Sequence, residues 1–374
     1  MSESAAIFDL TPTEEEVMTR EVMRRFAAEE MAAKARAADE ARSLPDGFLD
    51  KTVELGLNFM PIPEALGGVG AGRHPISNVL TIEDLAQGDM AMALAALAPL
   101  GVINTVMEWG SDAQKKTVAQ TLLADQFVPA AVALMEPGIS CDPGNLVTSA
   151  RQQSDGSWLL SGQKSLLPFG SDAKLLLVFA NAVNAGGESL GTRAFLMEGA
   201  LQGCAFAPEQ YMGLQPLPLY GLSMSDVALP ANAVLSDSFD LQRFLSLSRI
   251  ATAALAVGTC QSVLDYVKDY VNERVAFGEP ISHRQSVAFM VADMATELEG
   301  LRLMVYRAAS QAEHGLDCNR MAYLVHRQAI KVGMKTGTDG VQLLGGHGFT
   351  REHPVELWYR NLRALPVLNG LVVA

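Results

Sequence analysis

Few residues in this sequence have the types and spacing that nucleophilic, acid–base or metal chemistry needs. The four cysteines, at positions 141, 204, 260 and 318, form no CxxC pair, and no cysteine or histidine cluster has metal-ligand spacing. Neither a phosphate-binding P-loop nor a Ser-His-Asp constellation is visible. His347 stands beside two glycines and His283 beside Arg284, settings more typical of loop or interface histidines. The residue pattern alone therefore predicts no metal site.

Charge and composition narrow the class of protein. The 374 residues are 49% hydrophobic and 19% charged, enough for a sizeable core shared by two or three packed units. The formal net charge of −14 disfavours nucleic acid or an anionic membrane as a partner, because phosphates require clustered basic residues. The apolar stretch from Leu245 to Val263 contains Arg249 and has polar flanks, so we interpret it as a buried helix and not as a membrane span.

The cysteines and the N-terminal residues predict a cytoplasmic location. Widely scattered cysteines are most simply interpreted as reduced, buried thiols, which are usual in the cytoplasm. The first residues, MSESAAIFDLTPTEEE, are acidic and polar, so we expect no secretory signal.

The elements that would position a site follow the order helix, strand, helix. Residues 1–126 are predicted as an N-terminal helical domain with a break at PIPEALGGVGAGRHP. Residues 127–236 carry short apolar runs between turn signals, including a hairpin turn at Ser154–Gly156, and are predicted as a middle β domain. Residues 237–374 are predicted as a C-terminal helical bundle, with helices over 244–275, 284–313 and 319–343. The predicted fold class is α+β with several domains.

Six stretches, in order, resemble the acyl-CoA dehydrogenase family. They are ELGLNFMPIPEALGGVG (54–70), LMEPGISCDPGNL (134–146), LSGQKSLLPFGSDAKLLLVFA (160–180), MSDVALPANAVL (224–235), ERVAFGEPISHRQSVAFMVADM (273–294) and QLLGGHGFTREHPVELWYRNLR (342–363). This resemblance implies a barrel-like middle β domain, a C-terminal four-helix bundle, dimers that usually pair as tetramers, and FAD. It also implies that a base removes a proton from Cα of an acyl-CoA thioester while a hydride leaves Cβ for the flavin.

The edge that reaches a partner subunit's FAD in this family is retained. The resemblance implies that Arg274 pairs with the FAD diphosphate, since a guanidinium fork suits phosphate oxygens, while Phe277 and Gln285 contact the adenine end. A glycine pair lets backbone approach the cofactor closely. The implied cofactor-binding residues are Arg274, Phe277, Gln285, Gln342, Gly345 and Gly346, and the implied substrate-binding residue is Arg249.

The chain's own flavin pocket departs from the family pattern. Leu166 and Pro168 stand where the family has an aromatic residue against the flavin and a threonine near its N5 atom. Proline has neither a hydroxyl nor an N–H to donate. In the preceding signature, Met135 and Cys141 replace a hydroxyl residue and a serine. These four departures along one face predict a pocket that no longer supports flavin.

The catalytic base is missing from both positions where the family places it. The usual glutamate, nine residues after the arginine of the YRD motif, is Asn369 here, and the alternative position before Arg249 is Ser248. Neither side chain can take the proton. Three other carboxylates remain candidates. Glu136 and Asp142 match structural positions of the signature, and Glu83 reads as an ordinary helix carboxylate.

Three functions remain open on these observations. The first is a catalytically degenerate subunit of a heteromeric acyl-CoA dehydrogenase that shares FAD with an active sister subunit across their interface, as occurs in this family for bulky steroid side-chain thioesters. The second is a homomeric dehydrogenase with a displaced base. The third is a flavin-free acyl-CoA-binding or scaffold protein. The expected partners are an acyl-CoA, a sister subunit or a second copy, and an electron-transfer acceptor.

Overall fold

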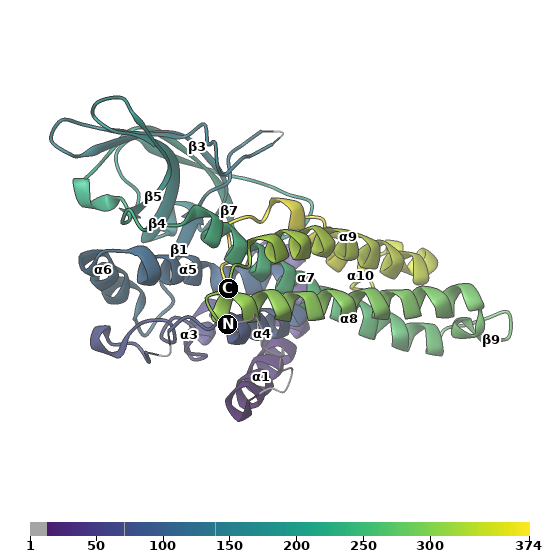
Figure 1. Cartoon of the computed structure of the whole chain (residues 1–374). Helices are drawn as coiled ribbons and strands as arrows, with labels where there is room; N and C mark the ends of the chain where they lie inside the picture. The colour runs from purple at the N-terminus through teal and green to yellow at the C-terminus, as the bar shows by residue number, and fades with distance from the viewer. Residues whose placement is uncertain (1–12, 71, 139) are drawn as a thin grey trace.

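The computed structural model describes residues 13–70, 72–138 and 140–374. Most of the N-terminal stretch on which the expectation about secretion depends lies outside these residues. Figure 1 shows the β region above the N-terminal helices, with the long C-terminal helices extending to one side and the C-terminal residue where the three parts meet. The α+β class predicted from the sequence is confirmed.

The N-terminal helices are built around one fully buried helix. Thr13 caps the first helix through a reciprocal capping box with Glu16. The helices are α1 (Glu14–Phe26), α2 (Ala33–Ala41), α3 (Phe48–Val53), α4 (Pro75–Gly88), α5 (Met90–Trp109) and α6 (Asp112–Leu122), with a π-helical turn at Ala27–Ala32 between α1 and α2. Nearly every residue of α5 is buried, which explains why its sequence is apolar on all sides.

The middle region forms one mixed sheet of seven strands, in the order β1-β4-β2-β3-β7-β6 with β5 on β4. The strands are β1 (Ala130–Ala133), β2 (Ser149–Gln152), β3 (Trp158–Pro168), β4 (Leu175–Val183), β5 (Ser189–Glu198), β6 (Cys204–Pro208) and β7 (Leu219–Leu229). β4 pairs in parallel with β1 and β2, and the other pairs are antiparallel. β2 and β3 are joined by the predicted turn at Ser154–Gly156.

The C-terminal helices pack lengthwise and carry a small hairpin at one end (Figure 1). They are α7 (Leu241–Glu273), α8 (Gln285–Glu313), α9 (Asn319–Leu343) and α10 (Val355–Leu362), and the hairpin strands β8 (Val275–Ala276) and β9 (Glu279–Pro280) join α7 to α8. Short 3-10 helices lie at 64–66, 170–172, 231–233, 281–283, 345–349 and 365–367. The bundle prediction is confirmed.

The helices α5 and α7 are long and apolar enough to cross a membrane by composition alone. Most of each helix is buried inside the protein, at 94% and 72% of its most apolar window. Burial of this extent is what core helices of a folded domain show, as the sequence predicted for 245–263.

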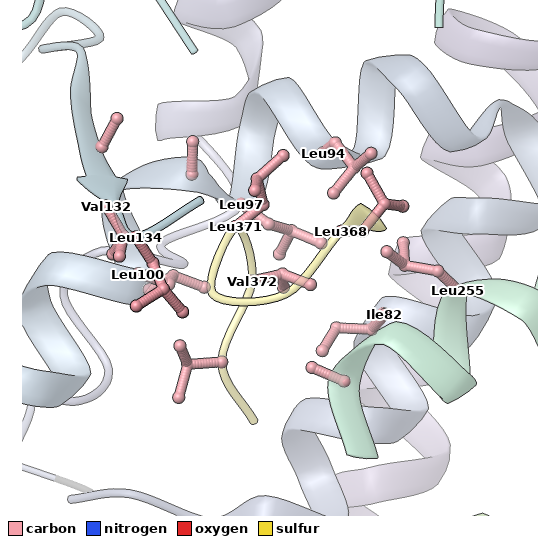
Figure 2. Packing of buried hydrophobic residues seen from close by; sticks show 14 of the residues in the cluster. Ile82, Leu94, Leu97, Leu100, Val132, Leu134, Leu255, Leu368, Leu371 and Val372 are labelled. Atoms are coloured by element: carbon pink, nitrogen blue, oxygen red, sulfur yellow. The ribbon is translucent and has the colours of Figure 1, made fainter. Parts of the chain in front are cut away.

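The last residues of the chain are part of the core and do not lie on its surface. Figure 2 shows this segment, in yellow, running between α5 and α7 beside β1. Leu368, Leu371, Val372 and Val373 are each no more than 3% exposed. They belong to the same apolar cluster as Leu94, Leu97, Leu100, Val132, Leu134 and Leu255.

Candidate active site

The two positions expected to carry a base come together in space. Ser248 lies on α7 and Asn369 follows α10 by seven residues, yet the Gly370 N–H donates to Ser248 Oγ at 2.7 Å. Ser248 is fully buried and Asn369 is half-buried. The two positions that the sequence identified for the base therefore lie at one place in the structure. That place holds a hydroxyl side chain and an amide side chain.

Gly370 turns the chain inward at this place. Its φ is +85°, in the left-handed region that favours glycine, and a Cβ there would meet Leu134 Cδ2 at 2.9 Å. The Leu371 N–H bonds the Leu368 carbonyl across the turn at 3.5 Å. The turn directs Leu371 and the residues that follow it between α5 and α7.

Polar groups on both helices hold this inward segment. The Asn104 amide of α5 donates to the Val373 carbonyl at 3.2 Å, and the Ala374 N–H donates to the Leu247 carbonyl at 3.3 Å. The Thr252 hydroxyl approaches the Leu368 carbonyl at 3.5 Å. Gly101 of α5 lies against β1, because a Cβ there would meet Val132 Cγ2 at 2.9 Å; the carbonyl oxygens of residues 370 and 371 would lie 3.8 Å from it, at ordinary contact distance.

Arg249, the expected substrate-binding residue, lies half-buried on α7 without a carboxylate partner among the described residues. Its guanidinium stands over the Tyr323 ring at 5.8 Å from the ring centre. Burial and the charge of Arg249 together lower the pKa of the neighbouring His326 to about 4, so this imidazole is neutral at pH 7. Within the part of the chain that the structure describes, Arg249 therefore has neutral neighbours and no counter-ion.

The alternative carboxylates are engaged elsewhere. Glu136 accepts hydrogen bonds from the backbone N–H groups of Val147 and Thr148 and pairs with the buried Lys164 at 2.9 Å. Burial alone would raise the pKa of Glu136, but the bonds from Thr148, the charge of Lys164 and the Val147 N–H outweigh it and lower the pKa. A carboxylate held ionised in this way is a poor general base.

Glu83 is not the ordinary helix carboxylate that the sequence suggested. It is 2% exposed and accepts from Arg302 Nε at 3.0 Å and from the Tyr306 hydroxyl at 2.7 Å. Asp142 is exposed and accepts the Gly144 N–H in a local turn. Among the described residues, none of the three candidates bonds to Ser248, Arg249 or Asn369.

The strand face expected to meet a flavin ring has no free donors at its key positions. The Leu166 N–H donates to Glu209 Oε2 at 2.8 Å, and Pro168 has no N–H. Glu209 also accepts from the Ser165 hydroxyl at 3.0 Å and the Tyr211 hydroxyl at 2.6 Å. Burial and the neighbouring Glu209 raise the pKa of Tyr211 to about 12. The Glu209 carboxylate thus accepts the hydrogen bonds that this face could otherwise donate to a flavin. The residues present therefore do not fit a flavin ring there.

The expected outer edge has the opposite character. Arg274 ends α7 and is exposed, and its side chain makes no hydrogen bond or ion pair with any described residue. Phe277 is 95% exposed in the β8–β9 hairpin, with Arg284 over its ring at 5.9 Å. Gln285, Gln342, Gly345 and Gly346 are not buried either. These groups are free to meet a diphosphate or an adenine on another surface.

Two hollows of the surface lie away from the inner site. One, of about 360 Å³, lies between α1 and α3, and another, of about 400 Å³, surrounds Arg20, Glu83 and Arg302. Ser248, Arg249 and Asn369 line neither of them.

Two residues at the site escaped sequence reasoning. Glu209 follows β6 in a loop with no recognisable motif, 43 residues after the strand position whose N–H it accepts. Asn104 offered a signal, because it is an amide within a mostly apolar 20-residue helix and such a group needs a partner when buried. That partner is the Val373 carbonyl.

Two family sequence models match the chain. The acyl-CoA dehydrogenase N-terminal domain matches residues 13–126 and the acyl-CoA dehydrogenase C-terminal domain matches residues 240–371. The chain is 30% identical over 364 residues to an acyl-CoA dehydrogenase of Bacillus subtilis, an alignment that covers 96% of this chain and 95% of that protein.

Solved structures agree. Butyryl-CoA dehydrogenase from Megasphaera elsdenii has a TM-score of 0.87 and 28% identity, covering 96% of this chain and 95% of its own. A chain in a structure described as the electron transferring flavoprotein of Acidaminococcus fermentans has a TM-score of 0.85 and 29% identity, with the same coverage. The predicted family, an oxidoreductase family with FAD as its cofactor, is confirmed. The chain belongs to the acyl-CoA dehydrogenase family.

Proposed function

We propose that this chain is the non-catalytic subunit of a heteromeric acyl-CoA dehydrogenase, in which an active sister subunit performs the α,β-dehydrogenation of an acyl-CoA thioester. The observation that carries the proposal is the 2.7 Å bond between Gly370 N–H and Ser248 Oγ. Both places for a base converge there, and neither a carboxylate nor another group of suitable pKa occupies them.

This chain's contribution is to bind and orient the sister's cofactor. FAD supplies the hydride-accepting ring when it is bound in the sister subunit. The unpaired Arg274 would hold the diphosphate, Phe277 and Gln285 would meet the adenine end, and Gln342 with the Gly345–Gly346 backbone would complete the contact. Arg274, with no partner among the described residues, and Phe277, which is 95% exposed, support an interface, because a partner phosphate would find the guanidinium unengaged and a partner surface would cover the exposed apolar ring.

The proposal also covers the substrate, the electron acceptor and the cellular compartment of the complex. The substrate in this proposal is an acyl-CoA, more specifically one with a bulky acyl group such as a steroid side chain. The electrons pass from the flavin to a separate electron-transfer protein. A cytoplasmic setting is supported by the four free cysteines, of which Cys260 and Cys318 are buried while Cys141 and Cys204 are only partly so.

The homomeric alternative requires a displaced base. The engagement of Glu83 by Arg302 and Tyr306, and of Glu136 by Lys164, argues against it. The flavin-free scaffold alternative agrees equally well with Glu209 on the inner face but gives no role to the bare Arg274.

Flavin content separates the three functions. The chain is purified alone and after co-expression with a candidate sister acyl-CoA dehydrogenase from the same organism, and bound FAD per chain is measured by absorbance after denaturation. We expect a colourless chain alone and a yellow complex with about one FAD per two chains. A yellow chain that turns over butyryl-CoA on its own contradicts the proposal, and a colourless complex favours the scaffold.

A further inference from the structure

The segment 368–374 occupies the space that a substrate would need in this chain. A base at position 248 or 369 could act only on a carbon within hydrogen-bond reach of it. Ser248 is fully buried, and its hydroxyl accepts the N–H of Gly370 at 2.7 Å. No acyl carbon can stand there while this bond is in place.

We propose that residues 368–374 are a built-in plug that fills this subunit's own acyl site, so that the subunit takes no acyl thioester. The inference deepens the proposed function and rests on it for the identity of the site. It goes further by naming what occupies the site, which the absence of a base alone does not determine.

The chemistry of the plug resembles that of the ligand it would exclude. Its buried side chains are branched hydrocarbons, namely Leu368, Leu371, Val372 and Val373, and they enter a wall of leucines and valines from α5, β1 and α7 (Figure 2). An acyl chain would need an apolar wall of the same kind. Because packed interiors hold no spare volume, the two occupants exclude one another.

The plug is anchored by polar groups as well as by apolar contact. Ser248, Asn104 and the Leu247 carbonyl each bond a backbone group of the segment, so the N–H groups of Gly370 and Ala374 and the carbonyl of Val373 are paired inside the core. Gly370 supplies the turn through its positive φ of +85°. Together these features fix one path for the segment, as expected for a permanent occupant.

Hydrogen exchange on the unaltered full chain tests the position of the plug. We expect the amide protons of Gly370 and Ala374 to exchange as slowly as those in the middle of α5 and α7, because both donate in the core. Exchange at the rate of an unstructured peptide would overturn the proposal.

A cavity variant tests what the space can hold. The double substitution Leu371→Ala and Val372→Ala should lower the melting temperature, and saturating benzene should recover about 2 to 4 °C of that loss, because a dry leucine-lined cavity binds benzene. Val367→Ala is the matched control, since Val367 directly precedes the plug, is 40% exposed and should show neither effect. A double variant as stable as the wild type, or benzene binding to the wild type, would sink the proposal.

Thioester binding tests the exclusion itself. Butyryl-, octanoyl- and hexadecanoyl-CoA are titrated into the wild-type chain alone by calorimetry. We expect none to bind, and one thioester bound per chain would overturn the plug. These measurements need neither flavin nor a sister subunit. If the plug is protected from exchange but no flavin complex forms, only the proposed function is contradicted. If the complex is yellow but the plug exchanges freely, only this inference is contradicted.

Discussion

The inner site and the outer edge of this molecule differ in whether their functional groups are engaged within the chain or exposed on its surface. At the inner site, Ser248 is sealed by Gly370 and the Leu166 N–H is taken by Glu209, so polar groups are satisfied within the chain. At the outer edge, Arg274 has no partner among the described residues and Phe277 is 95% exposed. A protein losing function everywhere would not keep one region bare and close the other. The contrast supports a chain selected for what it offers to another subunit.

Two glycines with similar backbone conformations give the largest expected difference between the regions. Gly370 at the inner site has φ +85°, and a Cβ added there would meet Leu134 atoms at 2.9 and 3.1 Å, whereas Gly345 at the edge has φ +57° and nothing within 4 Å. Gly370→Ala should lower the free energy of unfolding by about 2 to 4 kcal/mol through strain and overpacking. Gly345→Ala should cost about 1 kcal/mol through strain alone.

Denaturant unfolding of the two glycine variants measures the difference. Equal losses would mean that residues 370–374 are not packed against Leu134, and the inner site would then be as open as the edge. A larger loss for Gly345→Ala would reverse the comparison.

Arg274→Ala tests the edge. A charge-assisted pair with a diphosphate is worth about 1.5 to 3 kcal/mol, so the co-purified complex should bind FAD about tenfold to a hundredfold more weakly. The melting temperature of the isolated chain should not change, because the exposed side chain makes no hydrogen bond or ion pair with a described residue. Arg25→Ala is the control, since Arg25 is equally exposed on α1. Unchanged flavin occupancy at limiting FAD contradicts the role of Arg274 across the interface.

Acid should destabilise the inner region, through the buried imidazole of His326. Burial first, and then the charge of Arg249, lower the pKa of His326 from its ordinary 6.5 to about 4. The folded state therefore binds fewer protons than the unfolded state between these values, so this contribution is present above pH 6.5 and is lost as the pH falls to about 4. The loss should be about 2 kcal/mol, given about 1.4 kcal/mol per pKa unit and incomplete burial.

His326→Gln should flatten the stability profile between pH 6.5 and 4, measured by denaturant unfolding at several pH values. A profile that keeps its full slope in His326→Gln would show that another group carries the acid sensitivity.

The long elements were predictable from sequence because their periodic patterns were unambiguous. The end of α8 at Glu313 and both ends of α9, Asn319 and Leu343, match the predicted helices. The start of α7 was placed three residues late, because its N-cap, Asp240, precedes the apolar pattern. The proposed division at residues 126 and 236 stays a prediction.

The inner site was predictable only in part. The sequence identified Ser248 and Asn369 as empty positions, but nothing in LVVA distinguishes an apolar surface run from a segment that turns into the core. That path depends on the positive φ of Gly370 and on partners more than 100 residues away in sequence, such as Ser248 and Asn104. The capture of the Leu166 N–H by Glu209 is equally non-local.

The smallest expected effect comes from restoring a carboxylate at the inner site. It tests directly whether the missing base is the only feature that keeps this site inactive. Asn369→Glu restores the carboxylate at the family's usual position, on a half-buried residue whose side chain has no hydrogen-bond partner among the described residues. We expect no turnover, because Gly370–Ala374 still fill the space beside it and Glu209 still takes the Leu166 N–H. The variant is assayed with butyryl-CoA as flavin bleaching, in a complex whose sister subunit has lost its own base, with the intact sister as the positive control. Flavin bleaching above the background of the complex that lacks the sister's base would mean that the inner site lacks only one side chain for activity. The contrast between a closed interior and an exposed edge would then reflect a single substitution, and the homomeric alternative would become the better account of this chain.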